Sequence, residues 1–173
     1  MRTDWASFPA LHRLELGAGS VFDSLTLEAS LAGSIYSVTV QWGDCDPAGI
    51  VYYPNFFHYF DQATWNLFGA IGVTLPVMQS RYGAVGVPLV DAQASFKVPC
   101  WPGDKLEIES WVSDWKEKTF TVRHVVRKAG RDHLEGREIR IWGVRHPEDP
   151  QRLRAIPMPE DVRTALAALT PSR

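Results

Sequence analysis

The chain of 173 residues lacks the features that would place it in several large protein classes. Its two cysteines, Cys45 and Cys100, are too few for a disulfide framework. No apolar run approaches the roughly 20 residues that span a bilayer, and no charged segment followed by an apolar one marks the start as an export signal. The formal net charge of −2 argues against a general nucleic-acid binder. We therefore expect a cytoplasmic globular protein.

Motifs for metals and for phosphate loops are missing as well. The five histidines are scattered and show no ligand spacing with the cysteines, so no metal site is expected. Gly83 and Gly86 lack the strand–turn–helix context of a glycine-rich phosphate loop.

The most informative stretch runs from Trp42 to Gly72. Residues 44–49 combine two aspartates, a proline and a glycine, which predicts a turn or loop. Pro54 suits the first turn of a helix, where its missing N–H would have no partner. Apolar residues then recur every three or four positions up to Gly72, which predicts a helix with one buried face: Phe56, Phe60, Ala63, Leu67 and Ile71.

Alternating patterns predict five strands, over residues 35–42, 90–98, 105–115, 119–128 and 133–145. In the last of them, Ile139 and Ile141 are expected on one face. His124 is expected inside, as a satisfied core or interface residue. Residues 73–84 are expected to be irregular, and residues 159–169 to form a short helix.

Alternation with one polar side is typical of an antiparallel sheet with one covered face. The long helix after the first strand is best able to cover that face. We therefore predict an α+β domain over residues 34–173, a curved antiparallel sheet of about five strands wrapped around one central helix. Residues 1–33 are expected to be an extension, partly ordered at most. The sheet would leave edges that two copies could cover by pairing.

The aspartate loop directly before a helix start is a chemically suggestive arrangement. Free backbone N–H groups and the helix dipole favour negative charge at that point. A carbonyl held there would have its oxyanion stabilised, while Asp44 or Asp46 attacks the carbon or activates water. Spacing alone does not choose between the two acids. Cys45 lies between them, and their charges should raise the pKa of its thiol, which disfavours a cysteine nucleophile.

The run GDCDPAGIVYYPNFF, followed by Asp61, resembles the hotdog-fold acyl-CoA thioesterases, most closely the 4-hydroxybenzoyl-CoA thioesterase group. Weaker similarities lie in residues 88–96, 115–124 and 153–157, and the resemblance covers the chain from Ser34 to its C-terminal helix. It implies hydrolysis of an aromatic acyl-CoA, of the hydroxybenzoyl type. It also implies a site at a dimer interface, dimers that pair into tetramers, no metal, and no cofactor, because coenzyme A is part of the substrate.

Position by position, the resemblance implies that Asp46 is the catalytic carboxylate, as nucleophile or base, and that the Tyr53 N–H holds the thioester carbonyl. It implies that Asp61 receives the phenol hydroxyl of the acyl group. The family's basic cluster for the CoA phosphates falls at Lys116 and Lys118, with Glu117 between them.

Other readings of these residues remain open. His58, Asp61 and Trp65 share one face of the predicted helix. His58 could be the base of a hydratase or dehydratase, or simply a surface or interface histidine. Asp61 could be a solvated helix acid or one paired across an interface. Trp65 could line an aryl pocket or belong to the core. Lys116 and Lys118 could be ordinary solvated strand ends. A non-catalytic acyl-CoA-binding module is the third hypothesis.

Overall fold

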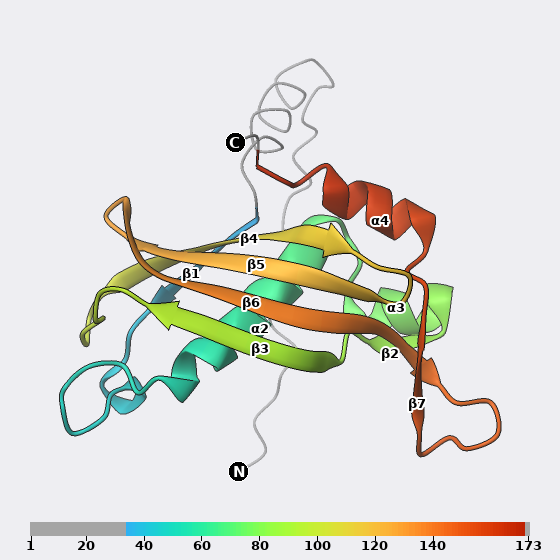
Figure 1. Ribbon diagram of the computed structural model, residues 1–173, viewed down its shortest axis with the longest axis horizontal. Helices are drawn as coiled ribbons and strands as arrows, with labels where there is room; N and C mark the ends of the chain where they lie inside the picture. The colour runs from blue at the N-terminus through green and yellow to red at the C-terminus, as the bar shows by residue number, and fades with distance from the viewer. Residues whose placement is uncertain (1–33, 172–173) are drawn as a thin grey trace, which may run out of the picture.

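The computed structural model describes residues 34–171, so the predicted extension over residues 1–33 lies outside the described part of the chain. Figure 1 shows the order of the elements. They are β1 (Ser34–Thr39), the 3-10 helix η1 (Trp42–Asp44), α2 (Pro54–Ala70), α3 (Leu75–Tyr82), β2 (Ala84–Gly86), β3 (Leu89–Phe96), β4 (Lys105–Trp115), β5 (Thr119–Lys128), β6 (Arg131–Arg145), β7 (Leu153–Ile156) and α4 (Glu160–Ala167). Within this part of the chain, no helix is both long and apolar enough to cross a membrane.

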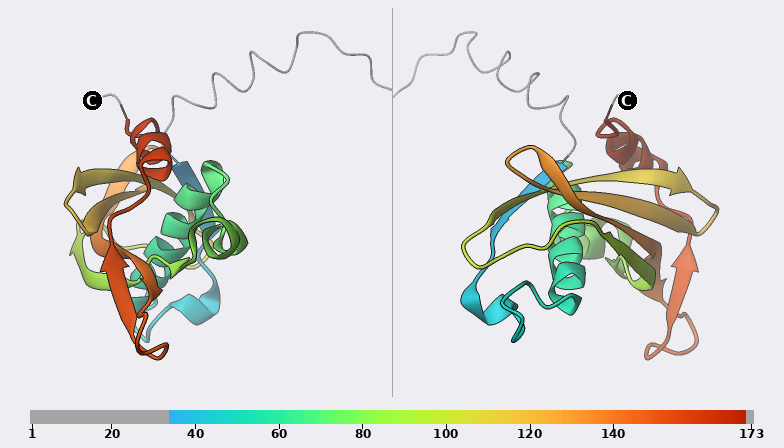
Figure 2. Two further views of the ribbon diagram at one scale, coloured as in Figure 1. Left: turned by 90° about the vertical axis from the view of Figure 1, so that its right-hand side faces the viewer. Right: turned by 60° about the vertical axis from the view of Figure 1, so that its left-hand side comes forward.

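The strands form one antiparallel sheet that curls around α2 (Figure 2). The order β1-β4-β5-β6 is continued by β3, which pairs with the first part of β6. The short strands β2 and β7 both pair with the last part of β6. The predicted sheet around a central helix is therefore confirmed. The structure adds β2 and β7, whose three and four residues are too short to show an alternating pattern.

The central helix α2 buries the face that its sequence predicts. Its core contacts fall into two clusters along its length, one near its start and one near its end. The first includes Phe56, Phe60, Ala63, Leu106 and Ile108, and the second includes Leu67, Phe68, Met78 and Trp142. Since burying one large apolar side chain stabilises a fold by about 1.5–3 kcal/mol, these contacts hold the start of α2 and the loop before it in place.

The prediction that residues 73–84 are irregular is wrong, because they contain the helix α3. Pro76 lies in its first turn, and Gly83 ends it with a left-handed backbone (φ 62°). Only Met78 of this helix is fully buried, so two turns leave too weak a periodic signal to recognise. The predicted β1 also ends early, at Thr39, because Trp42 begins η1.

Ile139 and Ile141 share one face of β6, as predicted, but this face lies away from the core. Ile139 and Ile141 are only partly buried, whereas the alternating residues Glu138 and Arg140 are fully buried against α2. Charged residues usually mark the solvent side of a strand, because an unpaired buried charge is costly. Here Glu138 and Arg140 neutralise each other, so the charged side of the strand faces the core.

Gly136, also on the inner side of β6, leaves room for the Phe60 ring of α2. A Cβ at this position would lie 2.4 Å from the Phe60 ring, which stacks on the His124 ring with centroids 4.6 Å apart. Replacing Gly136 by Ala is expected to lower the free energy of unfolding by about 1–3 kcal/mol, as overpacking does. Denaturant titration measures it, with Gly69→Ala as control, because Gly69 is exposed on α2 and has no atom within 4 Å of the added Cβ. Equal stability of Gly136→Ala and the parent would contradict this packing.

Candidate active site

Asp46 opens a tight hairpin in the loop before α2. Its backbone oxygen accepts a hydrogen bond from the Gly49 N–H (2.8 Å), and its own N–H donates to the Ile50 oxygen (3.0 Å). The Ala48 N–H donates to the side-chain oxygen Oδ1 of Asp46 (2.8 Å). Gly49 has φ 78°, a left-handed conformation that favours glycine. The turn thus fixes the Asp46 carboxylate through one oxygen, and no group in residues 34–171 hydrogen bonds to the other, Oδ2.

Asp44 is used differently. Its Oδ2 accepts the Gln41 N–H (2.7 Å), and its backbone oxygen accepts the Tyr52 N–H and the Asn55 side-chain amide (both 2.8 Å). Burial raises the pKa of Tyr59, and the neighbouring Asp44 carboxylate raises it further. Asp44 therefore holds the loop to the helix start. The hydrogen bonds thus give the two acids different environments, a difference that their spacing in the sequence does not reveal.

The backbone at Tyr53 offers an open donor at the start of α2. Pro54 has no N–H, the Asn55 N–H donates to the Tyr52 oxygen, and the Phe56 N–H donates to the Tyr53 oxygen. Within the described chain no acceptor lies against the Tyr53 N–H, and Tyr53 is 58% exposed. The start of a helix carries partial positive charge, so this N–H suits a developing oxyanion.

Cys45 pairs with Val51 across the same hairpin. Burial raises the pKa of the Cys45 thiol, and the carboxylates of Asp44 and Asp46 raise it further. A thiolate is the nucleophilic form of cysteine, so these neighbours disfavour covalent chemistry at Cys45.

The shared face of α2 carries the other predicted residues. His58 is exposed, and Trp65 is partly buried against β2, with its ring 3.4 Å from where a Gly86 Cβ would stand. Asp61 has a side chain 42% exposed, and its Oδ1 accepts a hydrogen bond from Arg140 Nη2 (2.7 Å). Asp61 is thus ion-paired within its own chain, whereas the alternatives drawn from the sequence were a solvated acid or one paired across an interface.

Behind Asp61 lies a buried polar network that the sequence reading missed. Glu138 accepts hydrogen bonds from Thr64 Oγ1 (2.7 Å), from His124 Nε2 (3.3 Å) and from Arg140, whose Nε and Nη2 each lie 2.9 Å from one of its oxygens. The Ser110 hydroxyl lies 2.8 Å from His124 Nδ1. The available signal was two opposite charges two residues apart in β6, which places both on one face.

The charge states in this network follow from burial and pairing. Burial lowers the pKa of His124, so its imidazole is neutral at pH 7, with Nε2 donating to Glu138 and Nδ1 accepting from Ser110. Burial alone would raise the pKa of Glu138, but hydrogen bonds from His124 and Arg140 outweigh it and lower the pKa to about 2. The expectation that His124 is a satisfied core residue is confirmed.

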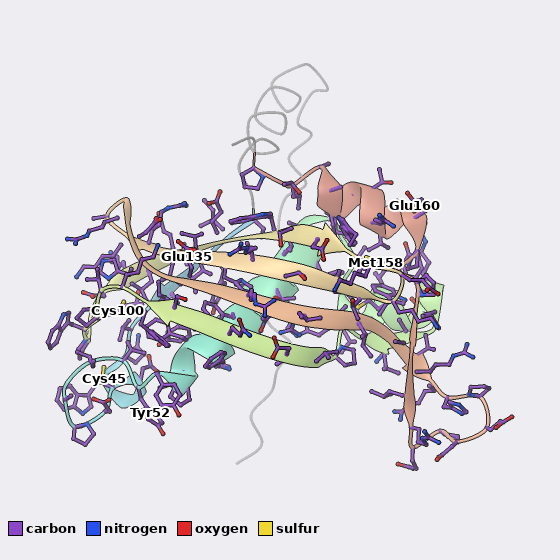
Figure 3. The ribbon with its side chains drawn as sticks, viewed as in Figure 1. Cys45, Tyr52, Cys100, Glu135, Met158 and Glu160 are labelled. Carbon is purple, nitrogen blue, oxygen red and sulfur yellow. The ribbon has the colours of Figure 1, made fainter. Side chains whose placement is uncertain are left out.

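Lys116 and Lys118 lie apart from the aspartate loop. They occupy the turn between β4 and β5, beside a narrow cavity that Met158 and Arg163 also line. In Figure 3, Cys45 and Tyr52 lie at one end of the sheet and Met158 at the other. Lys118 Nζ is 3.9 Å from the neighbouring Glu117 carboxylate. One copy of the chain therefore does not bring these lysines together with Asp46.

Comparison with known proteins identifies the family. Residues 40–166 match the Thioesterase-like superfamily. The chain belongs to this superfamily. It is 38% identical, over 70% of its own length and 89% of the relative's, to 4-hydroxybenzoyl-CoA thioesterase of Pseudomonas sp. strain CBS-3. It is 34% identical, over 57% of its length and 67% of the relative's, to 1,4-dihydroxy-2-naphthoyl-CoA hydrolase of Thermosynechococcus vestitus.

Solved structures of the superfamily share the architecture. The Pseudomonas 4-hydroxybenzoyl-CoA thioesterase gives a TM-score of 0.70 at 34% identity, covering 76% of this chain and 96% of that one. A gentisyl-coenzyme A thioesterase gives 0.65 at 31% identity, covering 75% and 98%. The predicted hotdog fold is therefore confirmed for this member of the Thioesterase-like superfamily.

Thioester cleavage in this superfamily member would need two groups. One attacks the carbonyl carbon or activates water, and the other stabilises the oxyanion. The hairpin at Asp46 and the helix start at Tyr53 supply a carboxylate and an N–H at the two ends of one short loop. The roles of Asp46, Tyr53, Asp61, His58, Trp65, Lys116 and Lys118 remain predictions.

Proposed function

We propose that this protein hydrolyses the thioester of an aromatic acyl-CoA to the free acid and coenzyme A. The carboxylate of Asp46 either attacks the carbonyl carbon, giving a mixed anhydride that water then cleaves, or takes a proton from the attacking water. In both routes the sulfur leaves with the electron pair of the broken C–S bond. The Tyr53 N–H and the α2 dipole stabilise the oxyanion.

One observation carries this proposal: a carboxylate oxygen and a backbone N–H at the two ends of the loop have no hydrogen-bond partner among residues 34–171, whereas groups beside them build the loop. Asp44, Tyr52, Asn55 and Phe56 make hydrogen bonds that build the loop and the helix start. Asp46 Oδ2 and the Tyr53 N–H make none with residues 34–171. An acceptor and a donor left free on a rigid loop are the pair that acyl transfer requires.

The acyl preference is inferred from Asp61 and from the relatives. Two of the compared enzymes are named for 4-hydroxybenzoyl-CoA and gentisyl-coenzyme A. A carboxylate whose Oδ2 accepts a hydrogen bond from a hydroxyl would favour a hydroxyaryl group, because an acyl group without that hydroxyl leaves this oxygen without a partner.

A second copy of the chain would complete the site. Asp61 follows Tyr53 by eight residues, roughly 12 Å along the helix, so one short acyl group does not readily span both in one copy. Among residues 34–171 only β6 pairs with β3, so the other edge of β3 is open there, and Leu89, Val90 and Phe96 are about half exposed. Pairing of two β3 edges would cover these side chains and bring a partner's residues toward the loop. We propose a homodimer on this basis, with tetramer formation as its further assembly.

Release of free thiol tests the function directly. Benzoyl-, 4-hydroxybenzoyl-, phenylacetyl- and short aliphatic-CoA are each incubated with the protein, and the aromatic thioesters are expected to be cleaved fastest. His58→Ala is expected to lower the rate by no more than about tenfold, because an exposed histidine outside the loop contributes no general base to hydrolysis. Loss of thiol release in this variant would place His58 in the hydrolytic reaction, whereas a hydratase or dehydratase would change the acyl group and leave the thioester intact. Affinity without thiol release from any substrate would indicate a binding module.

A further inference from the structure

The guanidinium of Arg140 is held in one orientation by groups that do not belong to the proposed reaction. Its Nε and Nη2 form a two-pronged contact with the two oxygens of Glu138, and its Nη1 donates to the Val87 oxygen (3.0 Å). The Arg140 side chain is only 3% exposed and that of Glu138 only 1%. Paired N–H groups in a planar fork fix direction as well as distance.

One N–H of Arg140 Nη2 is used by Glu138, and the orientation of the guanidinium directs the other toward Asp61. The distance from Nη2 to Asp61 Oδ1 is 2.7 Å. Asp61 itself lies on α2, a different element from β6, so the contact ties the exposed acid to the buried network. No group in residues 34–171 hydrogen bonds to Asp61 Oδ2.

The charge around Asp61 remains negative despite this contact. Glu138 already balances the single positive charge of Arg140, and His124 is neutral because burial lowers its pKa. Asp61 therefore adds a carboxylate that Arg140 orients without cancelling. Such a group accepts a hydrogen bond from a neutral hydroxyl and repels another carboxylate.

We propose that Arg140 is a positioning residue that holds Asp61 Oδ2 toward the acyl group, so that the enzyme selects acyl groups with a distal hydroxyl and rejects those with a distal carboxylate. This inference rests on the proposed thioesterase function. It applies equally whether Asp61 serves its own copy or a partner's, since the contact with Arg140 lies within one chain.

The test compares substrates rather than single rates. We would measure kcat/KM for 4-hydroxybenzoyl-, benzoyl- and 4-carboxybenzoyl-CoA in the parent protein and in Asp61→Asn, Arg140→Lys and Arg137→Lys. Arg140→Lys keeps the charge but cannot form the fork. It is expected to reduce the ratio of the 4-hydroxybenzoyl to the benzoyl rate by about tenfold or more, toward the value of Asp61→Asn. Asp61→Asn should also improve the cleavage of 4-carboxybenzoyl-CoA relative to benzoyl-CoA.

Arg137→Lys is the matched control. Arg137 lies on the same strand, β6, but on its outer face, where it contacts Gln93 and Asp91. In Arg137→Lys the ratio of kcat/KM for 4-hydroxybenzoyl-CoA to that for benzoyl-CoA is expected to stay at the parent value. The double variant Asp61→Asn/Arg140→Lys should show no further fall than Asp61→Asn alone, because both changes remove one interaction.

Several results would overturn the inference. An unchanged ratio in Arg140→Lys, an equal loss on all substrates, or an unchanged ratio in Asp61→Asn would each do so. Should Arg140→Lys fail to fold, Glu138→Gln/Arg140→Gln removes both buried charges together and must lower the ratio in the same way. Absence of thiol release from every substrate by the parent protein would instead refute the thioesterase function, which keeps the two failures distinct.

Discussion

Replacing Asp46 by Asn is expected to lower kcat/KM for aromatic acyl-CoA hydrolysis by about 10²–10⁴-fold. The amide cannot attack the carbonyl carbon, and it cannot take a proton from water. Its oxygen can still accept the Ala48 N–H, so the turn that Asp46 opens should be retained. The change thus removes the chemistry and leaves the loop in place.

Asp44→Asn is the matched control for this prediction. Asp44 lies two residues away and its carboxylate accepts the Gln41 N–H, a contact that an amide oxygen can also make. Its rate is expected to stay within about tenfold of the parent rate, since a side chain that only caps the loop takes no proton. Thiol release, measured under single-turnover and steady-state conditions, distinguishes the two variants. An Asp46→Asn protein as active as the parent would remove the basis of the mechanism.

Replacing Glu138 by Gln is expected to lower the free energy of unfolding by about 3–5 kcal/mol, the effect of breaking a buried ion pair. The variant leaves the Arg140 guanidinium inside the fold with one carboxylate, that of Asp61, and takes the charged acceptor from Thr64 and His124. Denaturant titration at pH 7 measures the loss. Glu135→Gln serves as a control, because Glu135 lies on the outer side of β6 and pairs with exposed Lys97.

The same variant makes a prediction about pH. Hydrogen bonds lower the pKa of Glu138 from 4.5 to about 2 in the folded protein, against the effect of burial. A lowered carboxyl pKa stabilises the fold above the unfolded value and ceases to do so as the pH falls through the folded value. The stability difference between the parent and Glu138→Gln should therefore shrink as the pH falls from 4.5 toward 2. A difference that does not change with pH over this range would contradict the role of the Glu138 charge.

The sequence predicts the elements that depend on local pattern. The helix over α2 and the main strands follow from regular apolar spacing, because each buries one face over many residues. Short elements escape this reasoning. The helix α3 buries Met78 alone, and β2 and β7 exist only because they pair with the end of β6.

In the candidate site, too, the sequence reveals the features that depend on local pattern and misses those that depend on contacts in the folded chain. The aspartate loop is recognisable because turn residues and a helix start are local signals. The choice between Asp44 and Asp46 needs hydrogen bonds that only the folded chain forms. Arg140 was missed for a physical reason: its burial depends on Glu138 and on Asp61, which lies 79 residues away in the sequence. Long-range charge pairing reverses the usual rule that charged residues face solvent.

The open edge of β3 would make a monomer of this protein prone to aggregation. No strand within residues 34–171 pairs with the backbone N–H and C=O groups of its outer edge, beside Val90 and Phe96, and such a row can pair with an extended peptide as well as with a second copy. On the proposed assembly, a newly made copy that has not yet dimerised would be the form most prone to mispairing and aggregation. If the proposed homodimer covers this edge, the rate at which two copies pair competes directly with the rate of aggregation.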